Sequence, residues 1–485
     1  MADNLKQKTI GGLFWSFIDN FAKLGIQFIV GIILARILSP REFGLVGMLT
    51  IFIAVSQTFV DSGFRTALIR KKHCSDEDYS TVFYFNMLVA VALYLVLFFS
   101  AGLISSFFEE PLLKSLLRVL GLGLIFSSFS IIQQTILTRE INFKLQTYVT
   151  LAAALGSGIL AVVMALNNYG VWSLVALTVS RFALTSLFLW IWSKWRPIFA
   201  FNIQSFKEMF SFGSKLLISS FINTVYQNIY LLIIGKYFTA QDLGFYTRAD
   251  QFRNLPSKNI MSVIQRVSYP VLSSIQEEEE RLKINYQKLI RSVMFITFLL
   301  MLGMAAVAKP MIVSLIGEKW LPSVVYLQLL CFVGMFYPLQ ALNLNMLNVK
   351  GRSDLFLKLE VIKKLIAIPV IIIGIFWGIE IMIIGMIVNS VIAYLLNSYY
   401  SGRLIGYTTV QQIKDILPSF LFAIVVNTVV LLIGQYLNTS NWMILGIQII
   451  VAVFLSIGLG EVFKVYDYIY LKTIILEQLR KYRRQ

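Results

Sequence analysis

The stretch LARILSPREFG at residues 34–44 is repeated in type by IGKYFTAQDLG at residues 234–244. Each stretch carries a cation, then a hydroxyl, then an acid three positions after the hydroxyl, and finally a glycine. The equivalent residues are Arg36 and Lys236, Ser39 and Thr239, Glu42 and Asp242, and Gly44 and Gly244. Every pair is separated by 200 positions, which indicates that the chain contains two related halves.

The repeated pattern has the spacing of a capping box. In a capping box a hydroxyl caps the free N–H groups of a helix, and an acid three residues later binds back to the capping residue. We therefore expect one helix to end and another to begin at Ser39 and again at Thr239. The glycines that follow permit close packing between membrane helices. One capping box alone is common, but two in the same frame predict a duplication.

The composition is that of a membrane protein. Of the 485 residues, 58% are hydrophobic and 14% are charged, and the mean hydropathy is +0.75. Soluble domains are less apolar and carry more charge. Most of the chain falls into apolar runs of about 20 residues, which is the length of a membrane-spanning helix. Since lipid admits only helices or closed barrels, and these runs do not alternate, the predicted fold class is an all-α polytopic membrane protein.

We predict about fourteen transmembrane helices. Their approximate ranges are 11–35, 42–64, 80–106, 112–136, 146–166, 170–193, 212–235, 242–267, 290–316, 322–346, 358–378, 380–401, 414–434 and 441–463. The duplication predicts two pseudo-symmetric six-helix lobes around a central cavity, at 1–200 and 201–405, and two C-terminal helices with a basic tail at 406–485. Pro256 and Pro270 are expected to bend or end the eighth helix.

Lysine and arginine in the connections predict the orientation, because they concentrate on the cytoplasmic side. With the N-terminus inside, the inner segments contain Lys6, Lys8, Arg70, Lys71, Lys72, Arg139, Lys144, Lys194, Arg196, Arg281, Lys283, Lys288, Lys350, Arg352, Arg403 and the tail residues Arg480, Lys481, Arg483 and Arg484. The outer connections at 167–170 and 435–441 contain none. Both termini are therefore expected in the cytoplasm. The net charge of +17 reflects this bias and attraction to anionic membrane lipids, rather than nucleic-acid binding.

Polar and charged residues lie within the predicted spans. A charge in hydrocarbon costs about 2.5–3.5 kcal/mol even on the most permissive scale, so such faces should meet protein or a water-filled cavity. Asp19 and Lys23 are four apart and are expected to neutralise each other. The candidate substrate-binding residues are Asp19, Lys23, Asp61, Arg65, Arg181, Lys215, Asn223, Arg248, Arg253, Lys258 and Arg266.

Cations outnumber acids on these faces, and this indicates an anionic substrate. Arg and Lys donate charge-assisted hydrogen bonds to phosphate oxygens, whereas a proton or sodium pump would be expected to carry isolated buried carboxylates. For each single charge the alternative is a structural ion pair or a side chain that reaches the membrane surface. Arg65 and Arg266 lie near the inner ends of their spans and are the strongest candidates for the second alternative.

Several motifs resemble a known family. They are IILARILSPREFGLVGM at 32–48, DSGFRTALIR at 61–70, LTREINFK at 137–144, YGVWSLV at 169–175, WRP at 195–197, IGKYFTAQDLGFYTRADQFRNLP at 234–256, RVSYPVLSSIQ at 266–276, GEKW at 317–320 and KGRSD at 350–354. With them the chain resembles the Wzx-type polysaccharide flippases, in the lipopolysaccharide biosynthesis or teichuronic-acid exporter branch of the multidrug/oligosaccharidyl-lipid/polysaccharide exporter superfamily. The resemblance covers nearly the whole chain and is weakest over the last two spans.

The resemblance implies a flippase for an undecaprenyl-diphosphate-linked oligosaccharide in the bacterial cytoplasmic membrane, working by alternating access in the synthesis of a surface polysaccharide. Membrane lipids, a glycan polymerase and glycosyltransferases are the implied partners. No cofactor is expected, and any energy input is expected from an ion gradient or the membrane potential. Replacing Lys215 and Arg248 with alanine is expected to lower transport without lowering membrane abundance.

Other chemistries have little support. The chain has no G-x-x-x-x-G-K-[ST] loop for nucleotide binding. One histidine, His73, and two cysteines, Cys74 and Cys331, do not form a familiar metal site. Four alternatives stay open: a lipid II flippase, a multidrug exporter, a membrane glycan polymerase or ligase, and an assembly scaffold. An enzyme would be expected to place acids in an outer loop, and only FFEEPLLK at 107–114 offers a pair.

Overall fold

A computed structural model describes the backbone of residues 2–61 and 63–483. Side chains are described over the same ranges except at positions 2–14, 17, 258–259, 262–263, 266–267, 475, 478–479 and 481–483. The described backbone is helical and contains no strand. The predicted all-α polytopic fold is thereby confirmed. The chain divides into two compact units, residues 1–244 and 245–485.

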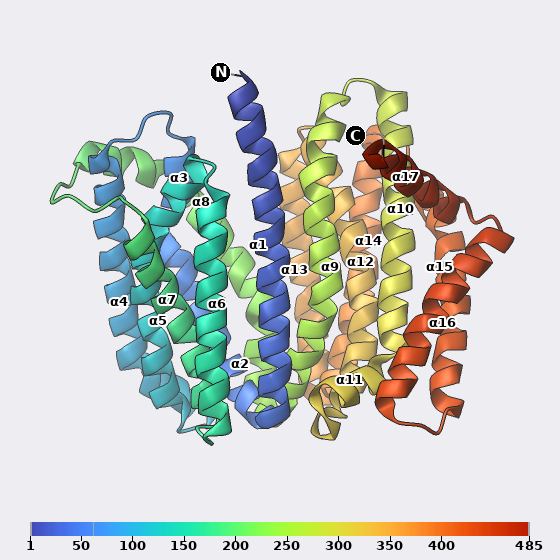
Figure 1. Ribbon diagram of the computed structural model, residues 1–485, viewed down its shortest axis with the longest axis horizontal. Coiled ribbons are helices and arrows are strands. Elements are labelled where there is room, and N and C mark those ends of the chain that lie inside the picture. Colours follow the sequence, from blue (N-terminus) through green and yellow to red (C-terminus); the bar gives the residue numbers. More distant parts are fainter. Residues whose placement is uncertain (1, 62, 484–485) are drawn as a thin grey trace. The chain divides into compact units, whose positions relative to one another are not determined.

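The described residues of the first unit form helices α1–α8 and the start of α9, and Figure 1 shows the helices in sequence order by colour. They are α1 (Ala2–Ile37), α2 (Pro40–Asp61), α3 (Phe64–Arg70), α4 (Asp76–Phe108), α5 (Leu113–Arg139), α6 (Phe143–Leu166), α7 (Trp172–Trp192) and α8 (Ile203–Tyr237). The boundary between the units falls inside α9 (Ala240–Ser274). Pro256 and Pro270 both lie within α9, so neither ends the helix.

The second unit contains the rest of α9 and the remaining helices. They are α10 (Glu279–Ala306), α11 (Ala308–Ile316), the 3-10 turn η1 (Glu318–Trp320), α12 (Ser323–Val349), α13 (Ser353–Trp377), α14 (Ile379–Ile405), α15 (Thr409–Tyr436), α16 (Asn441–Val462) and α17 (Tyr466–Arg483). The prediction of one continuous helix over 290–316 is wrong, because the helix is interrupted at Val307, between α10 and α11.

Twelve helices in the described part of the chain are long and apolar enough to cross a membrane. Two further predicted spans form helices, α9 and α13, that do not meet that criterion. In α13 the charged residues Lys358, Glu360, Lys363 and Lys364 lie within seven positions. Apart from 290–316, each predicted span therefore corresponds to one main helix.

Helix packing repeats between the two units. In the first unit α4 packs on α5, α5 on α7, and α6 on α7. The equivalent helices of the second unit pack in the same pairs, with α10 on α12, α12 on α14, and α13 on α14. This supports the duplication predicted from the two capping boxes. The predicted division at 200 and 405 stays a prediction.

The second predicted span does not continue to residue 64. Helix α2 ends at Asp61, and Gly63 takes a left-handed conformation with φ of +68° before α3 begins. A side chain at Gly63 would also meet the carbonyl oxygen of Gly213 on α8, since an added Cβ would lie 2.6 Å from it. The candidate residues Asp61 and Arg65 therefore lie on different helices.

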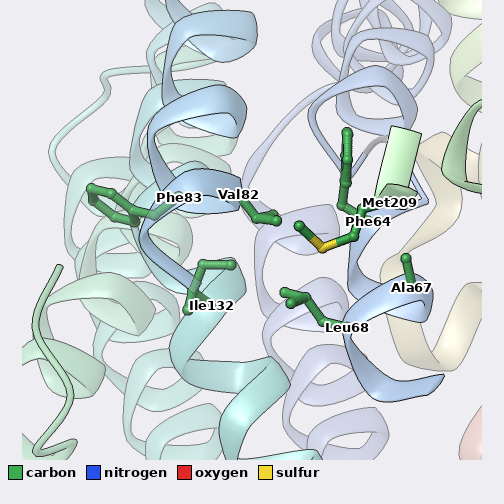
Figure 2. Close-up of a cluster of buried hydrophobic side chains, with 7 residues drawn as sticks. All are labelled: Phe64, Ala67, Leu68, Val82, Phe83, Ile132 and Met209. Atoms are coloured by element: carbon green, nitrogen blue, oxygen red, sulfur yellow. The ribbon is translucent and has the colours of Figure 1, made fainter. Parts of the chain in front are cut away.

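The short helix α3 is held by a hydrophobic core (Figure 2). Seven buried side chains from α3, α4, α5 and α8 meet there: Phe64, Ala67, Leu68, Val82, Phe83, Ile132 and Met209. Three of them belong to α3, which explains why a helix of only seven residues keeps its place. The first turns of α8 are thus packed within the first unit.

Asp78 joins three segments at the same end of the first unit. Its carboxylate accepts from Lys71 Nζ at 2.8 Å, from Ser205 Oγ of α8 at 2.5 Å, and from the backbone N–H of Ser75 at 3.0 Å. The N–H of Asp78 donates in return to Ser75 Oγ at 3.2 Å, which completes a capping box. Burial acts to raise the pKa of Asp78, but the hydrogen bonds from Lys71 and Ser205 lower it more, so the pKa lies below its ordinary value of 3.8.

Replacing Asp78 with alanine is expected to destabilise the protein by about 3 kcal/mol, because Lys71, the buried Ser205 and the helix N-terminus lose their partner. Because the folded-state pKa is lowered, the carboxylate stabilises the fold above its ordinary pKa and this contribution is lost as the pH falls below about 4. Thermal unfolding of the purified protein against pH measures both effects. The control is Asp76→Ala in the same helical turn, where the side chain is exposed. Equal stability of the two variants would contradict the assignment.

Candidate functional site

The two copies of the repeated stretch form the predicted helix starts. Ser39 donates to Glu42 Oε2 through its backbone N–H at 2.6 Å and through its hydroxyl at 2.9 Å. Thr239 donates to Asp242 Oδ2 in the same two ways, at 3.2 and 2.6 Å, and its hydroxyl accepts from the Asp242 N–H at 3.1 Å. In both copies one helix ends two residues before the hydroxyl and the next begins directly after it. The second copy forms a complete capping box, whereas in the first copy Glu42 binds back to Ser39 but its own N–H donates to the Ser39 backbone carbonyl at 3.2 Å. The predicted helix starts are confirmed at both places.

The two glycines of the repeat pack against each other's helices. A Cβ added to Gly44 would lie 1.6 Å from the carbonyl oxygen of Ala240, and one added to Gly244 would lie 1.9 Å from that of Pro40. Pro40 and Ala240 are themselves equivalent positions of the repeat. The contact is therefore reciprocal, as across a two-fold axis, and it leaves no room for any side chain at either glycine.

One loop of the first unit binds both repeated connections. Arg41 Nη2 donates to the two carboxylate oxygens of Glu110 at 2.8 and 3.0 Å. Lys236 Nζ binds Glu109 Oε1 at 2.9 Å and lies 5.1 Å from the ring centre of Phe107. The hydrogen bond from Lys236 lowers the pKa of Glu109. The acids of FFEEPLLK at 107–114 thus form ion pairs with cations of the two connections.

Lys23 lies in a positive environment within the first unit. The carboxylate of Asp19 accepts a hydrogen bond from the Thr150 hydroxyl on α6, so its charge is shared between Thr150 and Lys23. Lys23 is exposed and lies within electrostatic range of both the acid Asp19 and the cation Arg181. Lys23 stands fourteen residues before the end of α1 at Ile37, about 21 Å along the helix axis. The neutralisation of Lys23 by Asp19 is therefore incomplete, and an anion would be attracted here.

Helix α8 presents an exposed polar stripe. Lys215, Ser219, Asn223 and Gln227 follow one another every four residues, and all four are exposed. Tyr230, which follows on the same side of the helix, is buried. The polar stripe thus extends over the first part of α8 and ends before its last two turns. Lys215 lies about 33 Å from the end of α8 at Tyr237, so it stands near the membrane boundary.

Asp61 and Arg65 remain close although they lie on different helices. Arg65 is half-buried and lies within electrostatic range of Asp61. On the preceding turn of α2, Gln57 accepts from Ser127 Oγ of α5 at 3.0 Å. These contacts are typical of residues that join helices, so the alternative of a structural pair gains support at this position.

In the second unit two of the predicted cations make local contacts. Arg248 is only 6% exposed, donates to Gln251 Oε1 at 2.5 Å, and lies 5.7 Å from the ring centre of the buried Trp320. Arg253 pairs with Asp250 Oδ1 at 2.6 Å, one turn away on α9.

Because Arg248 is buried, Arg248→Ala is expected to lower the amount of protein in the membrane, whereas the sequence predicts unchanged abundance. The side chains of Lys258 and Arg266 lie outside the described residues.

One ionic site in α13 was not predicted. Lys363 is buried and forms an ion pair with Glu360, one turn earlier. Four charged residues within seven positions of a predicted span were the available signal. No group of three or more His, Cys, Asp or Glu side chains that could hold a metal lies among the described residues.

Comparison with known proteins places this geometry in a family. Residues 33–325 match the family described as polysaccharide biosynthesis protein. The chain is 27% identical over 419 residues to the lipopolysaccharide biosynthesis protein WzxC of Escherichia coli K12, covering 86% of this chain and 81% of that one. It is 28% identical over 310 residues to the succinoglycan biosynthesis transport protein ExoT of Rhizobium meliloti 1021, covering 63% and 62% of the two chains.

A solved structure has the same fold. The lipid II flippase MurJ, in an inward closed conformation, superposes with a TM-score of 0.73 over 94% of this chain and 98% of its own, at 17% identity. The fold and the family match agree with the resemblance carried by the motifs, from IILARILSPREFGLVGM at 32–48 onward. This multi-pass membrane protein belongs to the polysaccharide biosynthesis protein family.

Proposed function

We propose that this protein is a flippase that carries an undecaprenyl-diphosphate-linked oligosaccharide across the bacterial cytoplasmic membrane by alternating access. Its relatives are named for the synthesis or transport of surface polysaccharides. The fold is that of a lipid II flippase. Both termini are proposed to lie in the cytoplasm, consistent with the lysines and arginines of the predicted inner segments.

The positive environment of Lys23 is the observation that carries this proposal. A diphosphate needs cations that no carboxylate has neutralised, because only such cations are free to donate charge-assisted hydrogen bonds to phosphate oxygens. Lys23 is suited to this role, because it is exposed, has the cation Arg181 within electrostatic range, and its neighbour Asp19 accepts a hydrogen bond from Thr150. Its depth of about 21 Å along α1 is suited to a headgroup crossing the membrane.

The exposed stripe of α8 gives the oligosaccharide a polar surface. Ser219, Asn223 and Gln227 offer hydroxyl and amide groups, which bind sugar hydroxyls as both donors and acceptors. The prenyl chain stays in the lipid, since transferring its apolar surface to water is unfavourable. Glycosyltransferases that build the substrate and a polymerase that consumes it are the proposed partners. The protein itself is proposed to transport and not to catalyse.

Depletion of the protein in its native cells tests the function. The lipid-linked oligosaccharide is then labelled from outside with a membrane-impermeant reagent and compared with the total extracted pool. We expect fully built oligosaccharide to accumulate and to be protected from the reagent. Re-expression of the wild-type chain is the control and should restore labelling.

Two other outcomes would replace the proposal. If the oligosaccharide is labelled from outside but is not polymerised, the protein acts after flipping, as a polymerase, ligase or scaffold would. If the lipid-linked peptidoglycan precursor is the species that accumulates, the protein is a lipid II flippase, with which it shares its fold. A multidrug exporter would change neither pool.

A further inference from the structure

The C-terminal helix α17 is set apart from the other helices of the second unit. It begins only three residues after α16 ends at Val462, and Lys464 takes a left-handed conformation with φ of 47° in the turn between them. Figure 1 shows α17, in dark red, lying across the end of its unit instead of parallel to α10. It does not meet the criterion for a membrane span.

The first turn of α17 is fixed by a buried ionic site. Asp467 accepts from Arg291 Nε of α10 at 2.9 Å and from Ser419 Oγ of α15 at 2.5 Å, and its side chain is 3% exposed. The guanidinium of Arg291 also lies 4.2 Å from the ring centre of Tyr466. Since one carboxylate binds two helices of the bundle, the start of α17 cannot separate from the unit without leaving charge buried and unpaired.

A hydrophobic contact then sets the direction of the helix. Tyr468 lies directly over Gly460, where an added Cβ would stand 2.7 Å from the ring. Tyr468 and Leu471 pack on the core formed by Phe295, Phe422 and Val426. One face of α17 is thus held against its own unit, and the opposite face is left uncovered.

The uncovered face mixes aliphatic and cationic side chains. Ile469, Thr473, Leu476 and Arg480 follow one another at spacings of four, three and four residues, which places them on one side of a helix. All four are exposed, and Ile469 and Leu476 are 39% and 43% exposed. The chain continues with Lys481, Arg483 and Arg484, so four of the last six residues are cations.

We propose that this face of α17 lies in the headgroup region of the bilayer and binds anionic phospholipid. The last span ends three residues before α17, so the bilayer is the adjacent surface. Ile469 and Leu476 would enter the acyl boundary and Arg480 would bind headgroup phosphates, as in interfacial amphipathic helices, while the cations that follow in the sequence add to the attraction. Lys472 does not contribute, because it is paired with Glu461.

A fluorescent probe at position 476 tests the proposal in the full-length protein. Cys74 and Cys331 are replaced with alanine, Leu476→Cys is labelled with an environment-sensitive dye, and the protein is placed in nanodiscs of phosphatidylcholine with or without phosphatidylglycerol. Lipids with a nitroxide near the headgroup report contact by quenching. The control is Glu277→Cys, which stands in an exposed acidic loop of the same unit.

We expect strong quenching at position 476 in discs that contain phosphatidylglycerol and little quenching at position 277. Each cation removed, as in Arg480→Gln and Lys481→Gln, should weaken the lipid-bound state roughly fivefold. A probe at 476 that is quenched no more than the one at 277 would overturn the proposal. Equal quenching with and without phosphatidylglycerol, unchanged by the two substitutions, would overturn the assignment to anionic lipid.

Discussion

Gly44→Ala is expected to destabilise the folded protein by at least about 3 kcal/mol. The added methyl carbon would stand 1.6 Å from the carbonyl oxygen of Ala240, and a backbone atom cannot move aside without separating the two helices. Alanine gains only about 1 kcal/mol of helix propensity over glycine. Gly244→Ala meets the same obstacle at Pro40 and should behave alike. Thermal unfolding of the purified protein in detergent measures the effect.

Gly102→Ala is the matched control, because Gly102 lies in α4 and an added Cβ there meets nothing within 4 Å. It should leave the midpoint of unfolding unchanged or raise it. The double variant with Gly44→Ala and Gly244→Ala should cost less than the sum of the two single variants, since one separation of the helices relieves both clashes. A Gly44→Ala protein as stable as Gly102→Ala would show that the close contact is not formed.

Joint replacement of Lys23 and Arg181 with alanine is expected to lower flipping about a hundredfold or more. Charge-assisted hydrogen bonds contribute about 1.5–3 kcal/mol each, and two such cations act on the diphosphate in the proposed function. Because Lys23 is exposed and Arg181 is half-buried, replacing both should leave the fold intact. Transport is measured in proteoliposomes with a fluorescent lipid-linked oligosaccharide and is normalised to the amount of protein.

Arg118→Ala is the control for charge. Arg118 also lies in the first unit, but its guanidinium packs on the ring of Phe98 at 4.1 Å and its Nε donates to the Phe98 carbonyl. Its loss should leave transport per molecule unchanged. Lys23→Arg should retain most of the activity, because it preserves the charge. If the doubly substituted protein flips the substrate at the wild-type rate, Lys23 and Arg181 do not bind the diphosphate.

The features predicted correctly from sequence depend on local patterns. The hydroxyl and acid at Ser39 and Glu42 are three residues apart, and that spacing alone determines a helix start. The apolar runs are long enough to indicate spans wherever lipid must be crossed. The Gly63 break was missed because a left-handed residue looks the same as a packing glycine within an apolar run. A serine and glycine beside Asp61 were the available sign of a turn.

The site was predicted less fully because pairing depends on the fold. The sequence presents Arg253 as a candidate cation for the substrate, yet Asp250 lies one helical turn before it and neutralises its charge in an ion pair. That pair could have been found from spacing. The contact of Arg291 with Asp467 joins positions 176 residues apart, and no local pattern indicates it. Trp320, which covers Arg248, lies in a separate turn and is likewise brought there only by tertiary packing.

The loop that carries Glu109 and Glu110 makes the duplicated connections unequal. A freshly duplicated gene has interchangeable halves, and each connection could then mutate on its own. In this chain a single loop supplies the carboxylate of Glu110 to Arg41 and that of Glu109 to Lys236. A substitution in either connection therefore changes an ion pair with that loop. Charge reversal at Lys236 should therefore be accompanied by a compensating change at Glu109 among relatives of this chain.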